Sequence, residues 1–409
     1  MLKKIMRVGG GGLGEDCKWV SDPWPPPPNT APKILIVAGE ASGDSHAARL
    51  VAAIKENLPQ AEFFGIGGEA LKAQGVRVLY PASELAVVGL WEVAARLPAV
   101  WRALKAIRLA LKTARPSLAI LVDFPDFNFW VARLARCFRV PVMYYISPQV
   151  WAWRTYRVRL IARLVDRMVV IFPFEEEFYR KRGVPVEYVG HPLRETLPPL
   201  PERRVLLEKR GLDPERLTVA LLPGSRAGEI RAHLPLMLAG AEILQKSLPE
   251  CQFILPCAST APVELIHSLV ANFPGTLGLV AGQSYPALAA AHLAVVASGT
   301  ATVEAALAGT PTIIVYRVSP LSYEVGRRLI RVEHVGMANL LAEERLFPEL
   351  IQDDFTPENL AREMLALVKD AGRLKKMRRG LARIVTSLGG PGASRRAARA
   401  ALELVGLRV

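Results

Sequence analysis

Residues 293–309 read LAVVASGTATVEAALAG, a short apolar run followed by a glycine turn and an alanine-rich segment. The apolar run 293–297 predicts a buried strand, and the segment 301–308, which Gly309 closes, predicts a helix. A strand, a tight turn and a helix in this order are typical of α/β folds. The free N–H groups at such a helix start can bind phosphate, and Gly299 lets the backbone come close to it.

A second junction of the same kind lies earlier in the chain. Residues 218–226 read TVALLPGSR, a strand that ends in Gly224, Ser225 and Arg226. Because ligands bind outside the carboxyl ends of strands in open α/β sheets, we expect both loops to face one nucleotide. Glu304 lies about one turn into the later helix, where its carboxylate could accept hydrogen bonds from a ribose. Either junction alone would more often be a structural connection.

Length, composition and charge limit the classes of protein. A chain of 409 residues favours two domains, and 51% hydrophobic residues with only 7% aromatic ones suit helices layered on a parallel sheet. The net charge of +14 indicates an anionic partner, either a phospholipid surface or a phosphorylated substrate. No nucleic acid is expected, because no basic run with interleaved aromatic residues forms a nucleic-acid motif. The sequence has no bilayer-spanning run and no signal peptide.

Strand and helix patterns divide the chain. Residues 1–32 hold glycine and proline runs that cannot pack a core, so we expect a disordered tail. Alternating strands and helices predict a Rossmann-like domain over 33–196, and a proline-rich connection leads into a second one over 197–386. Residues 387–409 are helical in pattern and are expected to return to the first domain. The predicted fold class is α/β, with two Rossmann-like domains and an interdomain cleft.

Individual elements follow from the same patterns. Helices are predicted at about 45–57 and at 129–137. Apolar runs predict strands that begin at residues 33 and 218 and others at 62–68, 118–123, 142–146, 167–171, 186–189, 253–256, 278–280, 293–297 and 312–316.

Two carboxylates follow one of these strands. Residues 121–128 read LVDFPDFN, which places Asp123 and Asp126 at its carboxyl end. Either could act as a general base that deprotonates a hydroxyl, and either could instead cap backbone donors of the loop. The GEASGD segment, 39–44, is a candidate phosphate or sugar loop, or simply the turn after the first strand.

Other chemistry is not indicated. The chain lacks the P-loop and dinucleotide-binding glycine patterns, so neither ATP nor NAD is supported. It has no Asp-x-Asp pair, so we expect no metal at a nucleotide-sugar diphosphate. His191 is a catalytic base or, as we favour, a structural residue. Ser42 and Ser298 have no matched histidine and aspartate for a hydrolase triad.

Residues 85–112 form an amphipathic segment. Apolar residues recur at helical spacing, basic residues lie between them, and Trp91 and Trp101 are candidate interfacial anchors. Such a helix lies in a membrane surface or faces its own protein core, and the pattern alone favours the core.

Taken together, the motifs resemble those of the lipid-A-disaccharide synthases, a family of GT-B glycosyltransferases. The resemblance covers nearly all of the chain from Lys33 to Leu407. Its motifs are GEASGD (39–44), FPDFN (124–128), SPQVWAWR (147–154), FPFEEEFY (172–179), VGHPL (189–193), LLPGSRAGEI (221–230) and SGTATVE (298–304).

This resemblance implies a reaction of lipid A, and hence lipopolysaccharide, biosynthesis in Gram-negative bacteria. The enzyme would transfer 2,3-diacylglucosamine from UDP-2,3-diacylglucosamine to 2,3-diacylglucosamine 1-phosphate, with inversion and without metal or cofactor. The products would be the β-1,6-linked disaccharide 1-phosphate and UDP.

The resemblance also implies roles for individual residues. Asp126 is the favoured general base and Asp123 its rival, while Arg226 contacts the diphosphate. The expected UDP-binding residues are Gly224, Ser225, Arg226, Glu229, Ser298, Gly299, Thr300, Glu304 and Asn339. The expected cleft and substrate residues are Glu40, Ser42, Asp44 and Asn128. Residues 336–341 read GMANLL where the family commonly has Ser-Leu-Pro-Asn before a leucine pair, which leaves the nucleotide contact of Asn339 open.

Acylated substrates change the interpretation of 85–112, because the corresponding region of the family contacts the membrane. The expected membrane-contact residues are Val88, Leu90, Trp91, Leu97, Trp101 and Leu104. We therefore expect a cytoplasmic protein that is peripheral on inner-membrane lipid, with a homodimer through the C-terminal helices left open.

Two other readings remain. One is a different GT-B enzyme or a sugar-nucleotide epimerase on the same fold. The other is a silent peripheral membrane protein that binds a nucleotide sugar without turnover.

Overall fold

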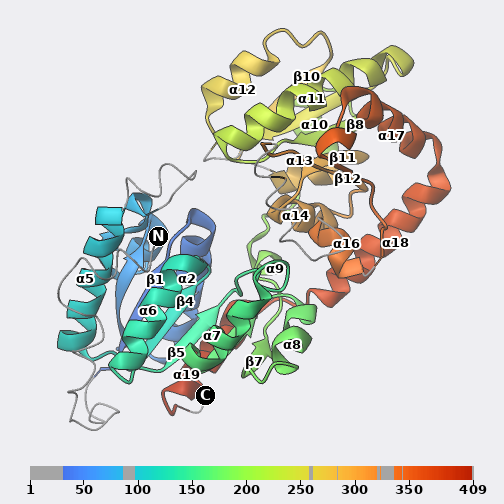
Figure 1. Cartoon of the computed structure of the whole chain (residues 1–409). Helices are drawn as coiled ribbons and strands as arrows, with labels where there is room; N and C mark the ends of the chain where they lie inside the picture. The colour runs from blue at the N-terminus through green and yellow to red at the C-terminus, as the bar shows by residue number, and fades with distance from the viewer. Residues whose placement is uncertain are drawn as a thin grey trace. The chain divides into compact units, whose positions relative to one another are not determined.

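The computed structural model describes residues 31–85, 97–257, 261–282, 284–319, 323, 336–342 and 344–407. All but two residues of the expected tail at 1–32 lie outside this part of the chain. The chain divides into two compact units, Met1–Pro192 with Pro391–Val409 and Leu193–Gly390. Each unit is built on one parallel sheet (Figure 1).

The sheet of the first unit has the strand order β3-β2-β1-β4-β5-β6-β7, and all neighbouring strands run parallel. β1 and β4 are apolar along nearly their whole length and are buried, because helices cover both faces of the sheet. The strands are β1 (Lys33–Ala38), β2 (Glu62–Gly67), β3 (Arg77–Pro81), β4 (Leu118–Val122), β5 (Val142–Tyr145), β6 (Arg167–Val170) and β7 (Val186–Tyr188).

The helices of this unit include one from the far end of the chain, α19, which packs against α2. Arg396 of α19 donates to the carbonyl oxygen of Val189 at 2.8 Å, and Glu403 pairs with Arg167 at 2.7 Å. The helices are α2 (Ala41–Asn57), α3 (Glu69–Ala73), α5 (Leu97–Ala114), α6 (Pro125–Cys137), α7 (Val158–Leu164), α8 (Pro173–Arg180) and α19 (Ala393–Leu404), with short 3-10 turns at Ala82–Glu84 and Thr155–Arg157.

The second unit has a parallel sheet with the order β10-β9-β8-β11-β12-β13. β8 and β11 are fully buried at its centre. The strands are β8 (Thr218–Leu222), β9 (Gln252–Cys257), β10 (Leu277–Ala281), β11 (Leu293–Ala297), β12 (Thr312–Tyr316) and β13 (Glu349–Ile351).

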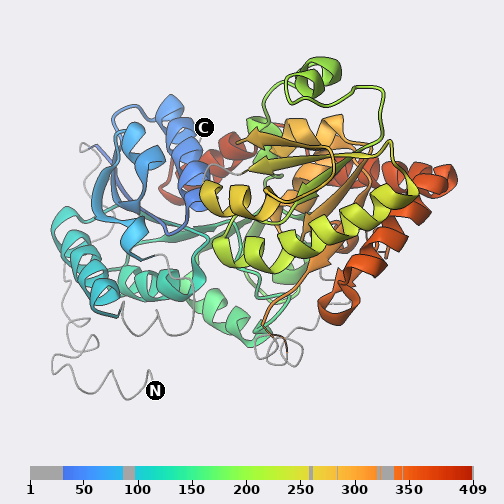
Figure 2. The same ribbon diagram turned by 90° about the horizontal axis from the view of Figure 1, so that it is seen from above.

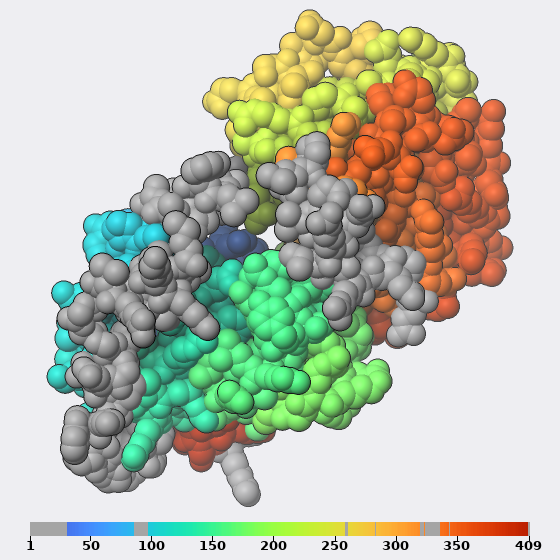
Figure 3. Space-filling model, in the orientation of Figure 1, coloured from blue at the N-terminus to red at the C-terminus, as the bar shows by residue number. Residues whose placement is uncertain are grey.

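Helices cover this second sheet on both faces. α11 and α17 lie side by side (Figure 2), and α17 and α18 form an orange to red part of the surface (Figure 3). The helices are α9 (Leu193–Thr196), α10 (Arg203–Glu208), α11 (Ala227–Ser247), α12 (Val263–Val270), α13 (Ser284–Ala290), α14 (Thr300–Ala308), α16 (Met337–Ala342), α17 (Pro357–Lys369) and α18 (Ala371–Ser387), with a 3-10 turn at Gln352–Asp354.

The strands predicted from the sequence are all present, and β11 and β12 have the predicted bounds. Two edge strands, β3 and β13, were not predicted. Two helices start earlier than expected, α2 at Ala41 and α6 at Pro125. Proline suits the first turn of a helix, because the N–H group that proline lacks would have no partner there. Ser42, Asp44 and Asp126 consequently lie in first helical turns.

Candidate active site

Both sheets have a topological switch point, where the strand order reverses and ligands bind in open α/β folds. In the second unit it lies between β8 and β11, which pair with Leu222 opposite Val296. In the first unit it lies between β1 and β4, where Ala38 is opposite Val122. The four loops after these strands therefore form two neighbouring pairs, one in each unit.

The loop after β8 is folded around the carboxylate of Glu229. Its Oε2 accepts the backbone N–H groups of Ser225 at 3.1 Å and Arg226 at 3.4 Å. Gly224 has a φ of +111°, and a Cβ at this position would lie 2.4 Å from the same oxygen, so glycine is required. Glu229 thus shapes the loop from inside, whereas the Arg226 side chain is 56% exposed and lies 3.4 Å from Glu229 Oε1.

The loop after β11 leads directly into α14. Ser298 donates its N–H to Val315 at 3.0 Å, which ties the loop to β12. Gly299 has a φ of +149°, a conformation that favours glycine, and both Gly299 and Thr300 are exposed. An exposed glycine turn at a helix N-terminus has the geometry of a phosphate site.

Glu304 lies on the second turn of α14 and is partly buried. Burial raises the pKa of its carboxyl group, and a hydrogen bond with the Ser284 side chain opposes this shift. A partly buried carboxyl beside a phosphate-type turn can accept hydrogen bonds from ligand hydroxyls.

His233, which was not predicted, ties together the loops after β8 and β12. It is fully buried in α11, with Nδ1 2.8 Å from the carbonyl oxygen of Pro223. Its Nε2 lies 3.0 Å from the backbone nitrogen and 3.1 Å from the carbonyl oxygen of Arg317. A histidine among the apolar residues of a helix was the only sequence signal for it.

Asn339 does not lie where a nucleotide could contact it. It is fully buried, and its Oδ1 accepts the N–H groups of Leu346 at 3.0 Å and Phe347 at 2.8 Å. Its Nδ2 donates to the carbonyl oxygen of Phe347 and to Glu349, both at 2.8 Å. The amide is fully used inside the unit, which corrects the expected UDP contact.

Asp44 likewise has a different place from the expected one. It is buried, and its two carboxylate oxygens accept the N–H groups of Gly68 at 2.7 Å and Ala70 at 2.9 Å. Asp44 therefore caps α3 from the first turn of α2. Glu40 and Ser42 are exposed at the carboxyl edge of β1.

The loop after β4 has an unusual backbone. Asp123 and Phe124 have φ angles of +46° and +49°, a left-handed conformation that costs about 1–2 kcal/mol per residue without glycine. The carbonyl oxygen of Asp123 accepts two hydrogen bonds, each 2.6 Å long, from Asn128 Nδ2 and the Tyr144 hydroxyl. Asn128 is fully buried, so it holds this loop in place and does not line a cleft as expected.

Asp126 projects from the first turn of α6, and its side chain is 74% exposed. Its Oδ1 lies 2.7 Å from Arg157 Nη2 and 3.5 Å from Arg154 Nη1. Among the described residues, Oδ2 has no such contact. Asp126 is thus an oriented, accessible carboxylate, and Arg157 is a contact that was not predicted.

Buried polar groups hold the loop that carries these arginines. Ser147 Oγ lies 2.7 Å from the Tyr179 hydroxyl, and Trp151 Nε1 donates to Glu175 Oε1 at 3.1 Å. Burial raises the pKa of Glu175 to about 8, although the Trp151 hydrogen bond opposes this. His191 is buried against Phe172, and burial lowers its pKa to about 3, which fits the structural role that we favoured.

Most apolar residues of α5 face the core. Leu104 is 7% exposed and packs in the core, which corrects its expected membrane contact, and Leu97 is partly buried. Trp101 and Leu109 are 43% and 62% exposed on the outer face. The expected contacts Val88, Leu90 and Trp91 lie outside the described residues. No helix within the described ranges is long and apolar enough to span a bilayer.

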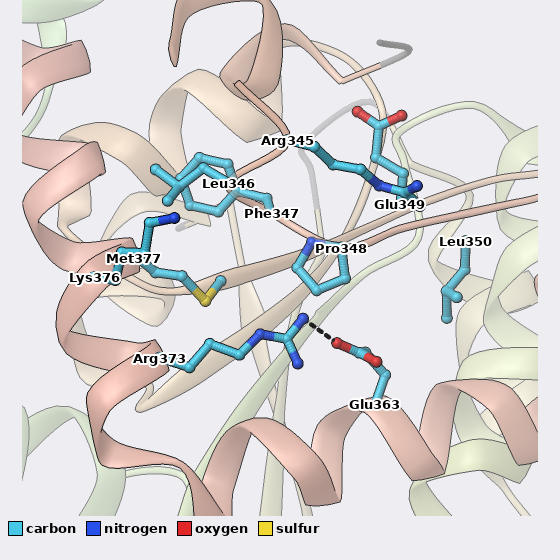
Figure 4. A pocket seen from close by; sticks show the side chains of 10 residues that line it. All are labelled: Arg345, Leu346, Phe347, Pro348, Glu349, Leu350, Glu363, Arg373, Lys376 and Met377. Atoms are coloured by element: carbon cyan, nitrogen blue, oxygen red, sulfur yellow. Dashed lines mark hydrogen bonds and ion pairs between the residues drawn. The ribbon is translucent and has the colours of Figure 1, made fainter. Parts of the chain in front are cut away.

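A cavity of about 340 Å³ lies elsewhere in the second unit, beside β13, α17 and α18 (Figure 4). Arg373 points toward Glu363 across it, with 2.5 Å between Nη2 and Oε1. The cavity shares no residue with the four loops.

Solved structures share the arrangement of two Rossmann-like domains. The calicheamicin glycosyltransferase CalG4 superposes with a TM-score of 0.57 at 17% identity, over 91% of this chain and 98% of that one. The Neisseria meningitidis UDP-GlcNAc 2-epimerase bound to UDP-GlcNAc has a TM-score of 0.61 at 14% identity, over 91% of this chain and 100% of its own. These similarities establish the GT-B fold, which serves different chemistries.

Sequence similarity is much closer to one family. The family model described as lipid-A-disaccharide synthetase matches residues 34–404. The lipid-A-disaccharide synthase of Geobacter sulfurreducens is 46% identical over 93% of this chain and 99% of its own length. That of Myxococcus xanthus is 46% identical over 91% of this chain and 98% of its own length. The chain belongs to the lipid-A-disaccharide synthase family.

Proposed function

We propose that this glycosyltransferase of lipid A biosynthesis transfers 2,3-diacylglucosamine from UDP-2,3-diacylglucosamine to the 6-hydroxyl of 2,3-diacylglucosamine 1-phosphate. The products are the β-1,6-linked disaccharide 1-phosphate and UDP. The family match over residues 34–404 carries this proposal, because it spans both sheets and all four loops.

In the proposed mechanism, Asp126 is the general base. Its Oδ2 takes the proton of the acceptor hydroxyl as that oxygen attacks the anomeric carbon, and the bond from this carbon to the diphosphate breaks on the opposite side. Attack from the opposite side inverts the anomeric centre. The ion pairs that hold Oδ1 and the exposure of the Asp126 side chain support this role. Asp123 stays the rival base, because it follows β4 and its loop lies next to the loop after β1, which carries Glu40.

The second unit stabilises the leaving UDP. The guanidinium of Arg226 and the N–H groups at the start of α14 stabilise the negative charge that develops on the diphosphate. Ser225, Ser298, Gly299 and Thr300 belong to the same two loops, and Glu304 accepts hydrogen bonds from the ribose. Glu229 acts through the shape of the Gly224 loop.

The domains take separate tasks in this proposal. Residues 33–196 hold the acceptor and contact the membrane, residues 197–386 hold the UDP-sugar, and 387–409 belong with the first domain. Trp101 and Leu109 would enter the lipid interface of the inner membrane, while exposed basic residues of α5 attract anionic lipid. A Trp101→Ala, Leu109→Ala double variant should bind anionic vesicles more weakly than the wild type.

A homodimer through the C-terminal helices is a separate prediction, and light scattering of the purified protein would test it.

The test is product formation by the purified protein with both acylated substrates in detergent and EDTA. Disaccharide together with UDP would establish the transfer and its independence from added metal. Bound UDP without turnover would instead favour the silent binder, and conversion of the donor without an acceptor would favour an epimerase.

A further inference from the structure

Arg154 and Arg157 carry more positive charge than their protein contacts neutralise. Their only acidic contact among the described residues is Asp126 Oδ1, at 3.5 Å and 2.7 Å. Each guanidinium has five N–H groups, so ten donors serve one carboxylate oxygen. The side chains are 31% and 19% exposed, so part of each guanidinium faces solvent, where an anion can reach its N–H groups.

The two guanidinium groups are also held in place. Arg154 lies 3.9 Å from the ring centre of Trp153, and Arg157 lies 5.5 Å from that of Phe129. The backbone of Arg154 has a φ of +67°. A left-handed conformation costs a non-glycine residue about 1–2 kcal/mol, and residues with such strain cluster at ligand-binding and active sites.

The position of Arg154 and Arg157 next to Asp126 indicates which ligand they bind. The proposed acceptor has a 6-hydroxyl that must reach the base and a phosphate on C1. C1 and C5, which carries C6, are both bonded to the ring oxygen, so the two groups lie at the same edge of the sugar ring. Arginine forks bind phosphate through paired N–H donors, and ten donors suffice for the Asp126 oxygen and a phosphate together. The donor's diphosphate is assigned to other residues, in the loops after β8 and β11.

We propose that Arg154 and Arg157 bind the phosphate group of the acceptor sugar. This inference rests on the proposed function, because it takes its ligand from that reaction. The arginine pair both orients the base and selects a phosphorylated acceptor. Transfer to a sugar without the phosphate is then slow.

The test compares two acceptors, 2,3-diacylglucosamine 1-phosphate and the same sugar without phosphate, with full-length enzyme. We expect the wild type to prefer the phosphorylated acceptor by about 100-fold or more in kcat/KM, from two charge-assisted contacts. Arg157→Gln and Arg154→Gln should each reduce this preference by about 10-fold or more and raise the KM for the phosphorylated acceptor, with the donor KM unchanged. Arg159→Gln removes an exposed arginine on α7 and should keep the wild-type preference.

Two results separate the inference from the proposed function. Disaccharide made equally well from both acceptors, or Arg157→Gln slowing both equally, would overturn phosphate binding and leave the transfer intact. No disaccharide from either acceptor would overturn the proposed function itself.

A second measurement does not depend on the variants. Inorganic phosphate should inhibit the wild type competitively with the acceptor and not with the donor. The absence of inhibition, or competition with the donor, would contradict the inference. Arg157→Lys keeps the charge but loses the fork, so its acceptor preference should lie between those of wild type and Arg157→Gln.

Discussion

The two switch points reach a similar layout by different means. In the second unit, the Arg226 side chain and the backbone N–H groups at the start of α14 form the candidate phosphate site, and glycine at 224 and 299 makes the conformations of the two loops accessible. In the first unit, Asp123 and Phe124 take left-handed conformations without glycine, and the buried side chains of Asn128 and Tyr144 hold them. Backbone N–H groups at a helix start can bind a large part of a diphosphate's charge, whereas proton transfer needs a side chain in one fixed direction. The difference therefore follows from the chemistry assigned to each loop.

The largest effect should come from the base. Asp126→Asn should lower kcat by about 10²–10⁴-fold, because the amide cannot accept the proton, while UDP affinity stays within about 3-fold. Turnover and UDP binding by calorimetry measure the two effects. An equal loss of both would mean that the loops of the two units are not functionally separate.

Breaking the glycine loop should have the opposite outcome. Gly224→Ala places a Cβ against Glu229 Oε2, so the loop must move and UDP affinity should fall by about 10-fold or more, in line with loss of one to two charge-assisted hydrogen bonds. Gly282→Ala is the matched control, because Gly282 also has a positive φ, +64°, but nothing lies within 4 Å of its added Cβ. Equal UDP affinity in both variants would show that Glu229 does not shape the site.

The two buried asparagines sharpen the comparison. Asn128→Ala and Asn339→Ala should each lower the free energy of unfolding by about 1–3 kcal/mol, because each leaves buried backbone groups without partners. At temperatures where both variants are folded, we expect Asn128→Ala to have a lower kcat than the wild type and Asn339→Ala to have the wild-type kcat. Neither variant should bind UDP more weakly than the wild type. Thermal unfolding, turnover and calorimetry test this pair. Weaker UDP binding by Asn339→Ala would restore our first assignment.

The last prediction concerns the pH dependence of stability at the loop that carries Arg154. Burial raises the pKa of Glu175 to about 8 from 4.5, so between these values the folded protein holds a proton that the unfolded chain has released. Stability should therefore fall as pH rises from about 5 to 8 and level off above that. Glu175→Gln should flatten this part of the melting-temperature profile. A profile with the same slope in both proteins would contradict the raised pKa.

Apolar runs predicted the sheets well because buried parallel strands are continuous in hydrophobicity. β3 and β13 were missed because they are edge strands without such a run. Motif residues were harder to interpret, since a polar residue in a glycine loop can serve a ligand or the backbone. Asp44 and Asn339 serve backbone groups of α3 and of residues 346–347, partners that no local spacing reveals.

Residues outside motifs were missed for a related reason. His233 and Arg157 act through loops that folding brings beside them, the first through Pro223 and Arg317, the second through Asp126. In α5 the helical period was read correctly, but periodicity does not say whether the apolar face meets the core or a membrane. The burial of Leu104 decides this for the inner face only.

The discontinuous make-up of the first unit affects how the chain matures during synthesis. α19 packs against α2 and buries Ala397, Ala398 and Ala401, yet it is among the last segments to leave the ribosome. The second unit is continuous in sequence, so it can close its own core while the first still lacks a helix. A nascent chain stalled before residue 393 would hold a finished second unit and an unfinished first unit, with the α2 surface exposed to chaperones and proteases.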